Sequence, residues 1–76
     1  MPRFPTATSK DVIRVAEKLD FEFSRQSGTS HAIYKRKSDR RRVVIPVHPG
    51  RDIKRKTLAA IISDLGITVD EFREML

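Results

Sequence analysis

Two histidines, His31 and His48, are the residues of this chain best suited to acid–base chemistry. His31 ends the segment Gly28–His31, in which a glycine turn allows a backbone to approach a ligand closely. Imidazole exchanges protons near neutral pH. One such group beside cations can cut RNA, because it takes the proton of a 2′-hydroxyl that then attacks the neighbouring phosphate. DNA lacks that hydroxyl, so this chemistry favours RNA as the substrate.

Both histidines also have a purely structural interpretation. A strand histidine beside a turn is more often a surface or hydrogen-bonded residue than a catalyst. His48 precedes Pro49-Gly50 and is either a second acid–base group or RNA contact, or a loop residue at a strand end. We slightly favour the loop interpretation. His31 is therefore the catalytic candidate and His48 an auxiliary one.

Other kinds of site lack their residues in this sequence. The chain has no cysteine, no glycine-rich phosphate loop and no HExxH pair, so thiolate chemistry and a cysteine zinc site are excluded. Two histidines without a matching carboxylate pattern make a poor metal site, and they give little support to a Ser–His–Asp arrangement. We expect no metal and no cofactor.

The positive charge is concentrated in the middle of the sequence. Residues 35–56 carry a net charge of +8, residues 1–34 carry +1 and residues 57–76 carry −3, within a total of +6. A solvated face is the usual meaning of a charge run, but this density favours a polyanionic ligand such as nucleic acid. The cations expected to bind the substrate are Arg40, Arg41, Arg42, Lys54, Arg55 and Lys56.

The spacing of apolar residues predicts the elements that must position these side chains. Helical spacing alternates with period-two segments in the order α-β-β-β-α-α. The predicted elements are a helix over 9–19, strands over 21–25, 30–37 and 42–47, a helix over 57–65, and a short helix opened by Thr68-x-x-Glu71. We expect an α+β fold in which the helices share one face of a three-stranded antiparallel sheet, leaving the other face open.

Several residues set the expected ends of these elements. Pro2 and Pro5 indicate an extended lead, and Thr8-x-x-Asp11 or Ser9 offers the first helix start. Pro46 makes its strand an edge strand or ends it, and Gly66 suits the end of the second helix. We expect Phe72, Leu76 and Met75 to pack inward from the last helix.

The length and hydropathy of the chain predict one small domain over residues 1–76. At 76 residues the chain holds a single modest core, and it has no linker or internal repeat. Met1–Ser9 lacks the apolar segment of a signal peptide, and no apolar run reaches membrane-spanning length. We expect a cytoplasmic protein that does not bind membranes.

Three segments together resemble the HicA mRNA interferase toxins. They are Arg25-Gln26-x-Gly28-x-Ser30-His31-x-Ile33-Tyr34, Arg42-Val43-Val44-Ile45-Pro46-Val47-His48-Pro49-Gly50, and Asp52-Ile53-Lys54-x-x-Thr57-Leu58-x-x-Ile61-Ile62-x-x-x-Gly66-Ile67. The resemblance covers nearly the whole chain. It implies a double-stranded-RNA-binding-domain-like fold, and the toxin of a type II toxin–antitoxin system that acts as a translation-independent mRNA interferase. It also implies a HicB-type antitoxin partner.

The resemblance assigns roles to the glycine turn. The single catalytic histidine of the family's Gly-Ser-His element maps onto His31, its glycine maps onto Gly28, and Ser30 lies with them against the substrate. The chain departs from the family pattern in three places. One extra residue separates Gly28 from His31, Asp20 replaces a glycine, and Arg55-Lys56 replaces a Pro-Gly or Lys-Gly pair.

Two other functions fit the same composition. A non-catalytic RNA-binding module of the same fold would shift RNA without cutting it. A small protein-interaction domain would use its basic face only to dock an acidic, antitoxin-like partner, and RNA affinity of the isolated chain would count against it. The Gly28–His31 element and the family resemblance favour the enzyme.

Overall fold

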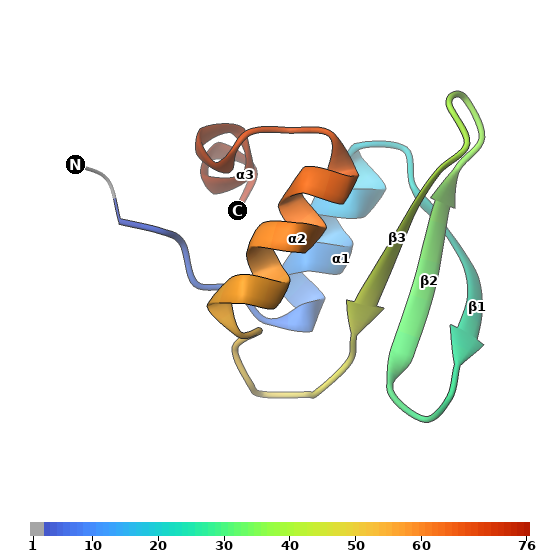
Figure 1. The fold of residues 1–76 in the computed structure, drawn as a ribbon, viewed down its shortest axis with the longest axis horizontal. Helices are drawn as coiled ribbons and strands as arrows, with labels where there is room; N and C mark the ends of the chain where they lie inside the picture. The colour runs from blue at the N-terminus through green and yellow to red at the C-terminus, as the bar shows by residue number, and fades with distance from the viewer. Residues whose placement is uncertain (1–2) are drawn as a thin grey trace.

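The three strands form one antiparallel sheet, and the helices lie on one side of it (Figure 1). The computed structural model describes residues 3–76. The elements are α1 (Ser9–Lys18), β1 (Glu22–Ser27), β2 (His31–Arg36), β3 (Arg41–Pro46), α2 (Arg55–Leu65) and α3 (Val69–Met75). The strand order is β1-β2-β3, so each hairpin joins neighbouring strands. The predicted α+β class and the α-β-β-β-α-α order are confirmed.

Reciprocal hydrogen bonds define the starts of two helices. The Asp11 amide donates to Thr8 Oγ1, and the Thr8 amide donates to a carboxylate oxygen of Asp11, at 3.3 and 3.0 Å. The same pair of bonds joins Thr68 and Glu71 before α3. The bond from the Thr8 amide holds the pKa of the Asp11 carboxyl below its ordinary value. The capping boxes predicted at both helices are confirmed, with Thr8 rather than Ser9 as the first cap.

Several predicted boundaries move by one or two residues. The first helix ends at Lys18, and Asp20 follows with a φ of 70°. The first strand covers Glu22–Ser27 rather than 21–25, because the Phe21 side chain packs in the core before the strand begins and pairing with β2 continues to the turn. The second helix begins at Arg55, two residues early. It ends at Leu65 as predicted, and Gly66 caps it with a φ of 80°, the left-handed conformation expected there.

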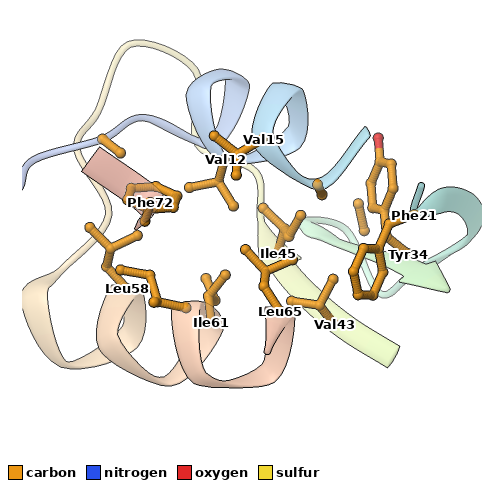
Figure 2. Close-up of a cluster of buried hydrophobic side chains, with 14 residues drawn as sticks. Val12, Val15, Phe21, Tyr34, Val43, Ile45, Leu58, Ile61, Leu65 and Phe72 are labelled. Atoms are coloured by element: carbon orange, nitrogen blue, oxygen red, sulfur yellow. The ribbon is translucent and has the colours of Figure 1, made fainter. Parts of the chain in front are cut away.

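The hydrophobic core lies between the helices and one face of the sheet (Figure 2). The sheet contributes alternate residues of β2 and β3, and α1 and α2 each contribute one apolar stripe. The largest fully buried side chains are Phe21, Phe72, Ile45, Leu58, Leu65, Val12, Val15 and Val43. Phe72 therefore packs inward as predicted, and Met75 is partly buried. The inward packing predicted for Leu76 is wrong: it is 44% exposed, because it lies beyond the last turn of α3.

The opposite face of the sheet is open. Side chains alternate between the faces of a strand, so residues that pair in register with one another share a face. The pairs His31–Pro46, Ile33–Val44 and Lys35–Arg42 lie on the face away from the core residues. The edge position of β3 and its end at Pro46 both agree with the role expected for this proline.

The two ends of the β2–β3 ladder carry different residues. His31 pairs with Pro46 at one end, and Arg36 pairs with Arg41 at the other. A strand advances about 3.4 Å per residue, so these two pairs lie about 17 Å apart. Figure 1 shows the β2–β3 hairpin at the upper end and the connection from β3 to α2 at the lower end.

The segments before α1 and α2 lie side by side. The Ile53 amide donates to the Ala7 carbonyl at 2.8 Å, and Thr8 forms an isolated antiparallel bridge with Asp52. This pairing holds the start of α2 against the start of α1. Of the two prolines at which an extended lead was predicted, Pro5 precedes α1 outside any helix or strand, and Pro2 lies outside the described residues. Within residues 3–76, no helix is long and apolar enough to cross a membrane.

Candidate active site

A surface pocket of about 640 Å³ lies where the open face of the sheet meets the start of α2. Strands β2 and β3 supply His31, Val44 and Pro46. The connection between β3 and α2 and the first turn of α2 supply the rest of the lining, which is His48, Arg51, Asp52, Ile53, Lys54 and Thr57. The pocket therefore combines two histidines with cations from a separate segment of the chain.

The β1–β2 turn determines the position of His31. Gly28 has a φ of 65°, which glycine adopts without the strain that a side chain would add. The Gln26 side-chain amide donates to the Thr29 carbonyl at 3.1 Å, and the Ser30 carbonyl accepts from the Val47 amide at 2.6 Å. His31 follows as the first residue of β2, with its side chain exposed. Gly28 and Ser30 shape this turn but do not line the pocket.

His48 reaches the same pocket from the end of β3. The bond between Val47 and Ser30 continues the pairing of the two chain segments one residue beyond Pro46. His48 then stands two residues from Pro46, the cross-strand partner of His31. The structure thus brings together the two histidines that the sequence analysis selected.

The start of α2 supplies positive charge to the pocket. Lys54 is the N-cap residue of α2, and its side chain makes no hydrogen bond to the amides of the first turn. Such amides and the helix dipole favour a bound anion. Arg51 lines the same pocket, and the sequence analysis did not include it among the substrate-binding residues. In the sequence, the signal that could have identified Arg51 as a substrate-binding residue is its place in the run of cations before the second helix.

The other two predicted cations of α2 lie beside the pocket rather than in its lining. The Arg55 guanidinium carbon is 4.8 Å from the centre of the Phe4 ring, which ties Arg55 to the N-terminal lead. Lys56 is exposed on the first turn. Among residues 3–76, no group of three or more histidine, aspartate, glutamate or cysteine side chains is arranged to hold a metal ion.

Residues 9–67 match the family described as the HicA toxin of bacterial toxin–antitoxin systems. The chain belongs to this family. The match covers α1, the whole sheet and α2, and it includes every residue of the pocket. Among curated proteins, none matches the chain. As a member of the HicA toxin family, the chain is the toxin component of a toxin–antitoxin pair, and an antitoxin is its partner.

The remaining predicted cations of this HicA toxin, Arg40, Arg41 and Arg42, lie at the far end of the sheet. The β2–β3 ladder separates them from the pocket of His31. Arg41 is engaged within the fold, since its guanidinium donates to the Asp64 carbonyl at 3.2 Å and lies 3.2 Å from an Asp39 oxygen. The structure therefore does not bring these three residues together with His31.

Asp39 organises the hairpin around these arginines. The Arg36 guanidinium donates two hydrogen bonds to the Asp39 carboxylate, at 3.0 and 2.8 Å, and these bonds lower the pKa of Asp39 to about 2. Arg36 also donates to the Leu19 carbonyl at 2.9 Å and stacks over the Phe21 ring at 4.6 Å. Arg36 therefore joins the hairpin to the segment between α1 and β1.

Proposed function

We propose that this HicA-family toxin is a translation-independent mRNA interferase in which His31 catalyses RNA cleavage. The observation that supports the proposal is that His31 shares one pocket with Arg51, Lys54 and the start of α2. A histidine next to cations and helix amides is the minimum set for cleavage by the 2′-hydroxyl. An mRNA substrate would place the toxin's action in the cytoplasm.

In this proposal His31 acts on the ribose, and the cations act on the phosphate. His31 takes the proton of the 2′-hydroxyl, whose oxygen forms a bond to the adjacent phosphorus while the bond from phosphorus to the 5′-oxygen breaks. The departing 5′-oxygen takes up a proton, from water or from His48 as the auxiliary group. Arg51, Lys54 and the first amides of α2 stabilise the negative charge that builds on the phosphoryl oxygens.

The residues around the pocket would hold the RNA strand. The turn containing Gly28 and Ser30 is adjacent to His31 and open to solvent at the glycine, where a Cβ would meet no atom within 4 Å. Lys54 would contact the phosphate nearest the cleaved bond, and Arg55 and Lys56 would contact phosphates beside it. These contacts would not distinguish one RNA sequence from another, because they bind the sugar–phosphate backbone of the RNA.

We further propose that a HicB-type antitoxin inhibits the toxin by covering this surface. His31 is exposed, and the cations around it are open to a partner. Acidic residues of the antitoxin would complement the cationic surface and speed the encounter, while burial of His31 would maintain the inhibited state. Inhibition would then be competitive with RNA.

The test of this function compares two matched oligonucleotides. The purified toxin should cut an RNA oligonucleotide, and it should leave intact the same oligonucleotide carrying a single 2′-deoxy substitution at the cleaved nucleotide. Binding of both without cleavage would instead favour the non-catalytic RNA-binding module. Equal cleavage of both would show that the 2′-hydroxyl is not the nucleophile.

A further inference from the structure

A second group of cations lies at the hairpin end of the sheet. Together with Arg36, four cations line a surface pocket of about 620 Å³. We call these four residues the hairpin cluster: Lys35, Lys37, Arg40 and Arg42. The cluster shares no lining residue with the pocket of His31.

The positive charge of the hairpin cluster is not neutralised within the fold. Asp39, the acidic residue of the hairpin, is engaged by Arg36 and Arg41. Glu22 pairs in register with Lys35, but these two side chains form no ion pair in the described part of the chain. Four adjacent cations therefore face solvent, and their mutual repulsion is a cost that a bound anion would remove.

Arg40 adds a second, independent observation. Its φ of 60° is the left-handed conformation that glycine, asparagine and aspartate adopt most readily. An arginine there strains the backbone, and such strain is concentrated at functional positions. The exposed side chain forms no hydrogen bond or ion pair within residues 3–76 that would offset the strain. No side-chain interaction among the described residues therefore accounts for an arginine at this position.

The hairpin cluster and His31 share one face of the sheet. Lys35 pairs with Arg42 and His31 pairs with Pro46, and both pairs lie on the open face. His31 and Lys35 are four residues apart on one strand, so about 14 Å of open sheet separates them. Ile33, which is only 4% exposed, and the half-buried Val44 occupy the face between them, so this part of the face presents little apolar surface. A ligand that reaches both ends must carry negative charge at two points about 14 Å apart, and the phosphates of an RNA backbone meet this requirement.

We propose that the hairpin cluster is a second phosphate-binding subsite, which holds the RNA strand several nucleotides away from the bond that His31 cleaves. The strand lies along the open face, with one phosphate at the start of α2 and another at the hairpin. This inference rests on the proposed RNA cleavage. It further specifies the substrate as a strand long enough to span both subsites.

The test measures cleavage of a trinucleotide and a dodecanucleotide with the same cleavage site by the full-length toxin. The variants are Arg40→Gly and Lys37→Ser, with Lys10→Ser on α1 as the charge-matched control. For single-stranded RNA, each lost phosphate contact reduces the slope of log K against log salt by about 0.7. This corresponds to a loss of about 5-fold in affinity at about 0.1 M salt. Each hairpin variant should therefore raise KM for the dodecanucleotide about 5-fold and leave the trinucleotide unchanged. Lys10→Ser should leave both substrates unchanged.

Arg40→Gly also separates binding from folding. Glycine relieves the strained φ, so the variant should unfold at the same temperature as the wild type or higher, while its KM for the long substrate rises. A rise in KM with unimpaired stability cannot come from a damaged fold.

The possible failures are distinguishable. A wild-type toxin that cuts neither oligonucleotide would refute the proposed function and this subsite with it. A wild-type toxin that cuts both, with KM values insensitive to Arg40→Gly and Lys37→Ser, would refute the subsite alone. If the variants weaken binding of the antitoxin and leave RNA cleavage unchanged, the hairpin cluster is a protein-docking surface and the inference is wrong.

Discussion

Replacement of Lys54 by serine tests whether the pocket beside His31 binds phosphate. Lys54 lines that pocket at the start of α2, makes no side-chain cap bond and forms no ion pair in the described part of the chain. If it neutralises one phosphate of a single strand, its loss reduces the slope of log K against log salt by about 0.7. The affinity should then fall about 5-fold at about 0.1 M salt and about 25-fold at about 0.01 M salt.

The assay is fluorescence anisotropy of labelled RNA oligonucleotides over a salt series, with His31→Ala as the common background so that the RNA stays intact. Unrelated sequences should lose affinity by the same factor, because the contact addresses the backbone. Lys10→Ser removes the same charge from α1 and should leave the slope unchanged. An unchanged slope in Lys54→Ser, or a loss confined to one RNA sequence, would refute phosphate binding by this residue.

Three further predictions concern the fold and the partner. Phe72→Ala should destabilise the domain by about 3–5 kcal/mol and lower Tm by at least about 12 °C. Leu76→Ala should change the free energy of unfolding by less than about 0.5 kcal/mol, because Leu76 lies outside the core. An equal effect of the two substitutions in thermal unfolding would contradict the packing of α3. Because the hydrogen bonds from Arg36 lower the pKa of Asp39 from 3.8 to about 2, their stabilisation is present above 3.8 and should be lost as the pH falls from 3.8 towards about 2. Acid unfolding of Asp39→Asn should lack this component, and identical profiles for variant and wild type would refute it. Binding of the antitoxin should protect His31 from diethyl pyrocarbonate and block RNA binding, so a complex with fully reactive His31 that still binds RNA would show that inhibition acts elsewhere.

Local signals in the sequence predicted the order of the elements and placed their ends to within two residues. Hydroxyl residues three positions before Asp11 and Glu71 predicted two helix starts, because the reciprocal cap bonds involve only neighbouring residues. Gly66 predicted the end of α2 for the same local reason. Leu76 was wrongly placed in the core, because the apolar spacing of α3 does not reveal that the helix ends one residue earlier.

The parts of the site that the sequence could not predict depend on strand pairing between residues far apart in the chain. Charge density grouped Arg40, Arg41 and Arg42 with Lys54, but the register of the β2–β3 hairpin places the arginines at the opposite end of the sheet. The same register brings His48 to His31. Composition could not show that Arg41 is bound to Asp39 and to the end of α2, because those partners are selected by the fold.

Cleavage of RNA by purified His31→Ala, compared with the wild type, tests the central proposal most directly. A group that moves a proton in the transition state typically contributes at least about 10²-fold to the rate, so the variant should lose cleavage by that factor or more and no longer arrest growth. Its circular dichroism should be unchanged, since His31 is exposed and outside the core. His48→Ala should lose less activity, because Arg51, Lys54 and His31 remain in the pocket. A folded His31→Ala toxin that cuts RNA at near the wild-type rate would contradict the account.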